Sequence, residues 1–584
     1  MQVIATAGHV DHGKSTLVQA LTGADPDRLA EEHRRGLSIE LGYCWTHWTG
    51  VGDCAFVDVP GHERFVPTML AGVGPVPAVL FVVAADDPWM PQSAEHLAAL
   101  DALGVRHGVV AVTRSDLADP TAAADAARTH LGRSSLAGAE IVPVSARTGV
   151  GMDELRAALA AMLGRVPAPD PEADVRLWVD RSFVVQGAGT VVTGTLPAGT
   201  VRVGDALTLG DVTIPVRGVQ TLGRDVESAA GVARVAIKLG GRRADDVHRG
   251  SVLLTPEAWH RTDVVDVRLA AGEVLPAEVT MHIGSAHSAC HVRPLDDSYA
   301  RLRLVQHLPL RPGDRALLRD PGSARIWGIE VVDPAPPPLR RRRAAQHRAA
   351  ALHASADHPG LAGELRRRGL VETSLLRRLG IDLAAADELA VGADGWLLDR
   401  GQVPDLAEQL RRLVTEHHRT RPLDRGMSVS AVARALELPT AELVPPLVPR
   451  GMRLEAGRVG PDQPAALPAD VERAVVQLEG DLREAPFRAP DADRLADLGL
   501  DAAATAAAAR AGRLLRVSPA VILLPGADEV AAERLAALPQ PFATSEARRV
   551  LDTTRRVVIP LLELLDRTGV TRRLPDDRRE IVAP

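Results

Sequence analysis

The sequence has little cysteine, no excess of positive charge and no long apolar segment. Its 584 residues include three cysteines, Cys44, Cys54 and Cys290, and no CxxC pair. This pattern argues against a disulfide framework and against a zinc site. No apolar run approaches the ~20 residues that cross a bilayer, and the first residues read as a strand rather than a signal sequence. These absences predict a soluble, cytoplasmic protein with no membrane contact.

The net charge and the length limit the kind of protein further. The formal net charge of −7 gives no global attraction to nucleic acid, so any such contact must come from a local basic patch. At roughly 150 residues per domain, a chain of this length predicts about four domains, or more if some are small.

The strongest motif lies at the start of the chain. A predicted buried strand (3–7) leads into residues 8–15, GHVDHGKS, which fit G-x-x-x-x-G-K-[ST]. The glycines allow a tight turn whose N–H groups point at phosphate oxygens. Lys14 supplies a positive charge for the β- and γ-phosphates and Ser15 an oxygen for Mg²⁺, while the following helix directs its positive end at the same phosphates. The stretch therefore predicts a nucleoside triphosphate site.

Further motifs follow in the order that a nucleotide switch requires. A predicted strand (54–59) leads to Asp58 and Gly61, which suit a Mg²⁺-bound water and the γ-phosphate, respectively. Between them and the first motif, Ser38 offers a second hydroxyl for Mg²⁺ in a loop that the γ-phosphate orders. Ser38 alone would be a weak signal, because an ordinary surface loop explains it equally well.

Three more apolar strands, at 79–84, 109–113 and 141–144, alternate with helical segments. Near-continuous apolar strands of this kind are typical of a parallel sheet, so the region predicts a doubly wound α/β domain with ligands at the strand ends. After the second of these strands, Asp116 can accept from N1–H and the N2 amino group of guanine, which adenine cannot match. After the third, the backbone of Ser145-Ala146-Arg147 can meet the guanine O6.

Taken together, GHVDHGKST, RGLSIELGY, DVPGHE, TRSD and SAR resemble the nucleotide motifs of translational GTPases of the elongation factor Tu group. The resemblance implies that GTP and GDP bind with Mg²⁺, which is held by Ser15, Ser38 and, through water, Asp58. It implies that His62 positions the attacking water, with Val10 and Leu37 as an apolar gate around it. No arginine finger is evident, so hydrolysis should be slow until the ribosome places His62. The implied GTP-binding residues are Gly8, Asp11, His12, Gly13, Lys14, Ser15, Thr16, Asp58, Gly61, Thr113, Arg114, Asp116, Ser145, Ala146 and Arg147.

Three positions depart from the pattern of that group. Ser38 stands where most members have Thr, Thr113 replaces Asn, and Arg114 replaces Lys. Serine keeps the hydroxyl but loses a methyl group, and arginine keeps an aliphatic stem and a plane that can stack on the base. Since Asp116 is retained, we expect guanine specificity.

Residues 172–336 contain short alternating strands separated by Gly-Asp and Pro-Ala-Gly turns, which predicts two β-barrels. The stretch VDRSFVVQGAGTVVTGTL resembles the second domain of selenocysteine-specific elongation factors. That resemblance implies an aminoacyl pocket carried by Asp180, Arg181 and Arg234. Arginines in a partly dry pocket would favour an anionic selenol and be left unpaired by serine. From the residues alone, a surface ion pair is the preferred interpretation of Asp180 and Arg181.

After a Pro/Arg-rich linker, amphipathic helices and hairpin-like ends repeat at roughly 60 residues, which predicts four winged helices. In the last one, TTRRVVIPLLELLDRTGVTRR resembles the winged helix that binds the messenger-RNA hairpin in this family. Arginines at a helix start and a wing can contact phosphates on two sides of a stem. Protein docking is the alternative use of this winged helix. The implied RNA-binding residues are Arg548, Thr554, Arg555, Arg556, Arg572 and Arg573.

The resemblance implies a monomeric GTPase that delivers selenocysteinyl-tRNA to the ribosome at in-frame UGA codons while its last winged helix holds a messenger-RNA hairpin. Two alternatives remain: another tRNA-delivering paralogue, or an RNA-binding regulator whose GTPase is only a switch. The predicted parts are a GTP-binding domain (1–171), two β-barrels (172–258 and 259–336), a linker (337–344) and winged helices at 345–402, 403–460, 461–525 and 526–584.

Overall fold

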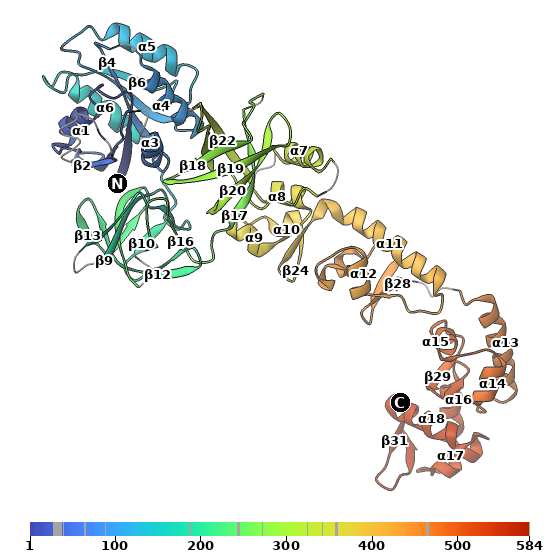
Figure 1. Cartoon of the computed structure of the whole chain (residues 1–584). Helices are drawn as coiled ribbons and strands as arrows, with labels where there is room; N and C mark the ends of the chain where they lie inside the picture. The colour runs from blue at the N-terminus through green and yellow to red at the C-terminus, as the bar shows by residue number, and fades with distance from the viewer. Residues whose placement is uncertain are drawn as a thin grey trace. The chain divides into compact units, whose positions relative to one another are not determined.

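The computed structural model of the chain is shown in Figure 1. It describes residues 1–26, 38, 40–62, 66–87, 89–185, 189–241, 246–270, 272–323, 325–340, 343–356, 360–462 and 466–582. These divide into two compact units, the first comprising 1–367 with 372–385 and the second 368–371 with 386–584. Within the described ranges, no helix combines the length and the apolar character that a bilayer span requires.

The first part of unit 1 is a doubly wound α/β domain, as the sequence predicts. Its six-stranded sheet has the order β2-β3-β1-β4-β5-β6, with β2 antiparallel to β3 and the other pairs parallel. The strands are β1 (Gln2–Ala7), β2 (Gly42–Trp48), β3 (Gly52–Asp58), β4 (Ala78–Ala84), β5 (His107–Thr113) and β6 (Glu140–Pro143). The helices are α1 (Lys14–Thr22), α3 (Val66–Val73), α4 (Pro91–Ala102), α5 (Thr121–Leu131) and α6 (Met152–Leu163).

Both faces of this sheet are buried, which explains why its central strands are apolar throughout. Alternate residues of β1 point to opposite faces: Val3 packs with residues of α3, α4 and α5, whereas Ile4 packs with residues of α1 and α6. This two-sided core places the loops at the carboxyl ends of β1, β3, β5 and β6 along one edge of the sheet. A ligand site at that edge is expected for this topology.

Two β-rich regions follow in unit 1. The first has β7 (Arg176–Trp178), β8 (Arg181–Val185), β9 (Gly189–Leu196), β10 (Thr200–Arg202), β11 (Ala206–Leu209), β12 (Val212–Thr221), β13 (Arg224–Val226), β14 (Ser228–Ala230), β15 (Ala233–Leu239) and β16 (Val252–Leu254). The second is a closed barrel of order β17-β20-β19-β18-β21-β22. Its strands are β17 (Arg261–Arg268), β18 (Glu278–Ile283), β19 (Ala286–Pro294), β20 (Tyr299–Pro309), β21 (Arg315–Arg319) and β22 (Ile326–Asp333). The predicted fold class is confirmed.

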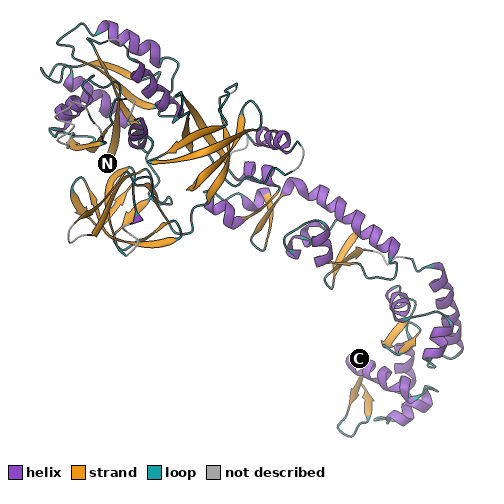
Figure 2. Ribbon diagram, in the orientation of Figure 1, coloured by secondary structure: helices purple, strands orange, loops and turns teal. Residues whose placement is uncertain are grey.

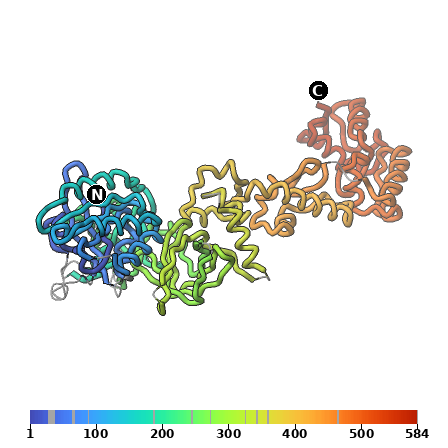
Figure 3. Tube along the Cα trace, turned by 90° about the horizontal axis from the view of Figure 1, so that it is seen from above, coloured from blue at the N-terminus to red at the C-terminus, as the bar shows by residue number. Residues whose placement is uncertain are grey.

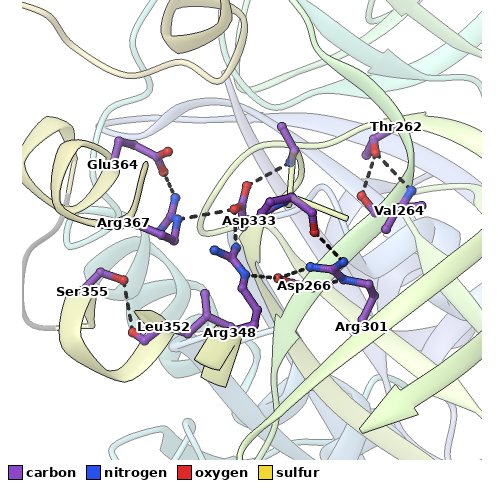
Figure 4. A network of polar contacts seen from close by, with 12 residues as sticks. Thr262, Val264, Asp266, Arg301, Asp333, Arg348, Leu352, Ser355, Glu364 and Arg367 are labelled. Carbon is purple, nitrogen blue, oxygen red and sulfur yellow. Dashed lines mark hydrogen bonds and ion pairs between the residues drawn. The ribbon is translucent and has the colours of Figure 1, made fainter. Parts of the chain in front are cut away.

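A buried ion network attaches the next two helices, α7 (Ala344–Ser355) and α8 (Leu361–Arg368), to the closed barrel (Figure 4). Arg348 on α7 donates from Nε to Asp266 Oδ2 over 2.6 Å and also pairs with Asp333. Arg301 holds the other side of Asp266 at 2.7 and 3.0 Å. Arg367 on α8 pairs with Asp333 at 3.4 Å. Both aspartates have no exposed side-chain surface, so the network is dry.

The remaining elements are short helices and small hairpins, seen as orange arrows in Figure 2. Strands pair as β23-β25-β24, β26-β28-β27, β29-β30 and β31-β32, so a hairpin occurs near each predicted wing. Residues from about 470 onward share one apolar core and form one compact body in Figure 3. The strands are β23 (Leu370–Glu372), β24 (Ala390–Ala393), β25 (Trp396–Asp399), β26 (Met427–Ser428), β27 (Met452–Glu455), β28 (Arg458–Pro461), β29 (Leu515–Ser518), β30 (Val521–Leu523), β31 (Thr571–Arg573) and β32 (Arg579–Ile581). The helices are α9 (Thr373–Arg378), α10 (Ala386–Leu389), α11 (Val403–Thr420), α12 (Val429–Ala435), α13 (Ala469–Glu484), α14 (Ala492–Asp497), α15 (Ala502–Arg510), α16 (Ala527–Ala536), α17 (Thr544–Val550) and α18 (Arg555–Arg567).

Candidate functional site

The loop after β1 has a backbone that only glycine allows at its ends. Gly8 has φ 127°, and a Cβ there would lie 2.1 Å from the Val82 oxygen. Gly13, directly before α1, has φ 81°, in the left-handed region. Lys14 is buried, and its ammonium donates to the carbonyl oxygens of Gly8 at 3.1 Å and of His9 at 2.6 Å. The amine therefore lies inside the loop, where phosphates are expected.

Three oxygen-bearing side chains from separate segments meet beside this loop. Ser15 Oγ donates to Asp58 Oδ2 over 2.6 Å and lies 3.1 Å from Ser38 Oγ. Thr6 Oγ1 donates to the other carboxylate oxygen of Asp58 at 2.7 Å, which fixes that side chain. Two hydroxyls and a carboxylate are hard oxygen donors of the kind that Mg²⁺ prefers. The three residues that the sequence assigns to Mg²⁺ thus lie together, and their donor set suits that ion.

Two buried histidines contribute contacts at this loop: His12, which belongs to it, and His96, which lies on α4. The Gly8 N–H donates to His96 Nδ1 at 3.0 Å. Burial, and then the nearby Lys14 and His9, lower the pKa of His96 to about 3, so the ring stays neutral and can accept this bond. His12 lies with Nδ1 3.4 Å from the Val82 oxygen and Nε2 3.2 Å from an Asp87 oxygen, and burial lowers its pKa as well. No signal in the sequence singled out His96.

Residues 113–116, which carry the predicted guanine specificity, contact the phosphate loop. The contacts are made by the two residues that depart from the common motif. Thr113 Oγ1 donates to the His12 oxygen at 2.7 Å. Arg114 donates to Asp86 at 3.1 and 3.2 Å and to the backbone oxygen of Asp11. Threonine and arginine here join the loops directly, so the substitutions have a structural role. Asp116 follows in an exposed turn.

The third guanine segment, residues 145–147, lies next to this loop, because the Ser115 N–H donates to the Val144 oxygen at 3.2 Å. Ser145 is buried, and its Oγ accepts the Thr148 N–H at 3.2 Å. Ala146 is half-buried and Arg147 is exposed. The residues predicted to contact the base therefore occupy neighbouring loops at the carboxyl ends of β5 and β6.

The predicted hydrolytic residues lie partly in the described chain. Gly61 packs against the phosphate loop so closely that a Cβ would be 2.5 Å from the Val10 nitrogen. His62 and Val10 are half-buried beside it, and Thr16 is exposed in the first turn of α1. Leu37, the other predicted gate residue, lies outside the described residues.

A cavity of about 580 Å³ lies between the segment before β2 and the strands β8 and β9. Glu40, Leu41, Asp180 and Arg181 line it, with His248 and Arg249 at its far side. Arg181 pairs with Glu40 at 3.1 Å and donates to the Leu41 oxygen. The cavity thus joins the segment that carries Ser38 to the first β-rich region.

Arg234 lines a second cavity of about 230 Å³ together with Arg181 and Tyr43. Its guanidinium pairs with both oxygens of buried Asp180, one at 2.7 Å, and lies 3.7 Å from the ring centre of Tyr43. Although burial opposes it, the Asp180 carboxylate raises the pKa of Arg234. Thr193 Oγ1 also donates to Asp180 at 2.7 Å. Arg234 therefore anchors Asp180, and Tyr43, which the sequence did not reveal, packs beneath the pair.

The predicted RNA-binding residues of the last winged helix differ in their surroundings. Thr554 precedes α18, and it is exposed together with Arg548 and Arg555. Arg556 donates to the carbonyl oxygens of residues 489, 490 and 520 at 2.6–3.0 Å, so it joins this winged helix to the preceding one. Two further arginines pair across the β31–β32 hairpin: Arg572 with Glu580 and Arg573 with Asp577.

Comparison with known proteins agrees with this architecture. Residues 1–165 match the elongation factor Tu GTP binding domain, and residues 533–579 match the winged helix of elongation factor SelB. The chain is 32% identical to the selenocysteine-specific elongation factor of Desulfomicrobium baculatum, over 99% of both chains. It is 38% identical to that of Escherichia coli (strain K12), over 58% of this chain and 57% of the relative.

A solved structure extends the similarity to the whole fold. A crystal structure of a bacterial selenocysteine-specific elongation factor, EF-Sec, covers 100% of both chains with a TM-score of 0.73 and 26% identity. The similarity therefore includes the winged helices, where the sequence signal is weakest. The chain belongs to the family of selenocysteine-specific elongation factors and is a translational GTPase that binds guanine nucleotides.

Proposed function

We propose that this factor delivers selenocysteinyl-tRNA to the ribosome at in-frame UGA codons, with its last winged helix bound to a messenger-RNA hairpin. GTP binding favours the cargo-holding form, and hydrolysis releases the tRNA. The factor works as a monomer in the cytoplasm. One observation carries the proposal: a cavity of about 580 Å³ contains Arg181 and adjoins the segment that bears Ser38.

The cavity chemistry favours an anionic aminoacyl group. A selenol is ionised at neutral pH, whereas a serine hydroxyl stays neutral. Arg181 and Arg249 line the cavity and can pair with a selenolate. A serine hydroxyl carries no charge with which these guanidinium groups could pair, which disfavours it. Arg234 pairs with Asp180, which lines this cavity, and lines a second cavity together with Arg181.

The same cavity gives a physical link to the nucleotide. Arg181 pairs with Glu40, two residues beyond Ser38, whose hydroxyl is 3.1 Å from Ser15 Oγ. When bound, Mg²⁺ would neutralise phosphate charge between Ser15 and Ser38, with Asp58 holding a coordinated water. A change at Ser38 then moves Glu40 relative to Arg181, which changes the charge that the aminoacyl group meets.

Hydrolysis requires a correctly placed water. We propose that His62 positions this water, with Val10 and Leu37 limiting its access, and that Lys14 neutralises charge developing on the phosphates. Among the described residues, Arg114 reaches the phosphate loop, but Asp86 and the backbone oxygen of Asp11 hold it, so we assign it no finger role. Hydrolysis should therefore be slow in the free factor and fast when the ribosome places His62.

The last winged helix would raise the local concentration of the factor at its codon. Arg548 and Arg555 are exposed around Thr554 and can contact RNA phosphates on one side of a stem. Binding to the message converts encounter with the ribosome into a nearly intramolecular event. Acidic residues such as Asp576 and Asp577 lie among the arginines of this winged helix, which suits a small and specific contact better than broad non-specific binding.

The decisive experiment measures spontaneous deacylation of selenocysteinyl-tRNA, and of the same tRNA carrying serine, with the protein and a nonhydrolysable GTP analogue. We expect slow deacylation of the selenocysteinyl form only, and loss of this protection with GDP or in Arg181→Ala. The matched control is Arg224→Ala, which removes an exposed arginine of the same β-rich region outside the cavity.

Each other result selects a different function. Equal protection of both aminoacyl forms keeps tRNA delivery but contradicts the anion argument and favours a general tRNA-delivering paralogue. Absence of protection for either form, with hairpin binding intact, indicates an RNA-binding regulator that carries no tRNA.

A further inference from the structure

Two cavities of unit 2 surround one cluster of arginines. They have volumes of about 330 and 540 Å³ and share the lining residues Asp424, Arg425, Arg458 and Arg510. These residues come from the chain after α11, from the β27–β28 hairpin and from the end of α15. The larger cavity also contains Arg421. The two cavities therefore meet at one arginine cluster.

The positive charge of this cluster is poorly balanced. Arg458 donates to the Gly426 oxygen and Arg510 to the Leu423 oxygen, each at 2.7 Å, and both acceptors are neutral carbonyls. Among the described residues, the side chains of Arg421 and Arg425 have no hydrogen-bond or ion-pair partner. Asp424, the shared acid, is 3.1 Å from His417 Nε2. Burial, and then Arg425, lower the pKa of Arg510, which shows that the cation is not fully compensated.

Arg513, which follows α15 in the chain, has a balanced charge environment and serves as a comparison. Arg513 pairs with Glu472 at 2.5 Å and with Glu479 at 2.6 Å. These two pairs raise the pKa of Arg513. Its cation is thus paired with two glutamates, whereas Arg425 and Arg510 lie near each other beside Asp424 and, among the described residues, form no ion pair with an acid. Like charges held together in this way destabilise the free protein, and an anion would relieve the repulsion.

A histidine points to the same missing partner. His418 lines the smaller cavity, and neither of its ring nitrogens, although both are buried, has a hydrogen-bond partner among the described residues. A neutral imidazole carries one N–H donor, and a buried donor without an acceptor costs free energy. An anionic oxygen in the cavity would accept this hydrogen bond.

We propose that Arg421, Arg425, Arg458 and Arg510 form a second RNA contact, which binds backbone phosphates independently of sequence. Guanidinium groups match phosphate oxygens in a two-pronged geometry. The described lining residues include no Phe, Tyr or Trp on which a base could stack, so the contact is with the backbone. Two cavities that share the cluster suit consecutive phosphates of a strand better than one small anion.

Naming RNA as the polyanion rests on the proposed function; the unbalanced cluster itself does not. The test uses the full chain and a fluorescein-labelled RNA hairpin whose stem has about 20 base pairs of arbitrary sequence. The variant is Arg421→Gln/Arg425→Gln, because neither side chain supports the fold. Two lost phosphate contacts should reduce the slope of log K against log [KCl] by about 1.8 and weaken binding at 100 mM KCl about tenfold or more.

The control is Arg412→Gln/Arg419→Gln, which makes the same change in net charge on α11. Both arginines pair with glutamates of that helix, at 3.0 Å with Glu408 and at 2.7 Å with Glu416. Its salt slope should match that of the unmodified chain. Equal slopes for both double variants, whether reduced or unchanged, would overturn the proposal, since only overall charge would then matter.

A second measurement distinguishes RNA from acidic protein. Phenylglyoxal modification, read by mass spectrometry, should be blocked by the RNA hairpin at Arg421 and Arg425 but not at Arg412. Polyglutamate giving the same protection would overturn the assignment to RNA. Arg555→Gln, measured with a messenger-RNA hairpin, tests the proposed function separately. If it weakens binding while the cluster variant leaves every salt slope unchanged, the further inference fails and the proposed function stands.

Discussion

The buried ion network around Asp333 allows a quantitative prediction. Three carboxylates (Asp266, Asp333 and Glu364) meet three guanidinium groups (Arg301, Arg348 and Arg367), and all six side chains are at most 9% exposed. Asp333→Asn preserves shape but leaves one positive charge unbalanced in a dry site. Breaking such a network costs about 3–5 kcal/mol. Because Arg348 and Arg367 lie on α7 and α8, the loss should appear as detachment of these helices from the barrel.

Hydrogen exchange of the α7 amides measures this detachment directly. A loss of about 3 kcal/mol or more corresponds to a decrease in protection of at least about 100-fold. The control is Glu330→Gln on the same strand, β22. Its 2.6 Å pair with Arg268 is partly exposed, so its loss should cost at most about 1 kcal/mol. Asp333→Asn/Arg367→Gln restores the charge balance and should recover part of the protection.

The reasoning is refuted if Asp333→Asn and Glu330→Gln reduce α7 protection equally. That result would mean that solvent screens the network as it screens a surface pair. The reasoning would also be refuted if Asp333→Asn/Arg367→Gln lost as much α7 protection as the two single variants, Asp333→Asn and Arg367→Gln, lose together. The charge balance would then play no part, and each side chain would contribute only its own contacts.

Three further predictions concern the nucleotide site. Thr113→Val leaves the buried oxygen of His12 without its 2.7 Å donor, so urea unfolding should show a loss of about 1–3 kcal/mol in the nucleotide domain that Thr113→Ser largely avoids. Asp58→Asn removes the charge that would hold a Mg²⁺-bound water, so the Mg²⁺ concentration for half-maximal binding of a fluorescent GDP should rise about tenfold, with binding in EDTA unchanged. The pKa of His96 is about 3 in the folded protein, whereas its ordinary value is 6.5. The unfolded chain therefore binds a proton at this residue at a higher pH than the folded chain does, so the free energy of unfolding falls as pH drops below about 6.5. His96→Gln should flatten that decline in urea titrations between pH 4 and pH 7.

The nucleotide site could be predicted from the sequence because its chemistry is local. A phosphate loop needs glycine where φ is positive or backbone is close, and Gly8 meets both conditions. Ser15 and Asp58 occupy fixed positions after their strands, so a parallel sheet brings them to one edge. The barrels follow in the same way from alternating strands and turns. In each case a short pattern determines the position of a side chain.

Contacts between distant segments could not be predicted in this way. Arg348 and Asp266 are 82 residues apart, and nothing in either neighbourhood indicates that they pair. Tyr43 lies in an ordinary-looking strand, yet its ring packs against Arg234 at 3.7 Å. Such pairs depend on how whole elements pack, which a single sequence does not encode in any short pattern. The predicted domain boundaries around α7 and α8 remain predictions for the same reason.

Arginine illustrates why charge in a sequence overstates the charge available for binding. The last winged helix carries a basic stretch that the sequence assigns to a small contact with RNA. In the structure, Arg556 donates hydrogen bonds to backbone oxygens, and Arg572 and Arg573 pair with acids of the hairpin. Arg548 and Arg555 are exposed and have no such partner among the described residues. The proposed cluster of Arg421, Arg425, Arg458 and Arg510 would add phosphate contacts outside the last winged helix.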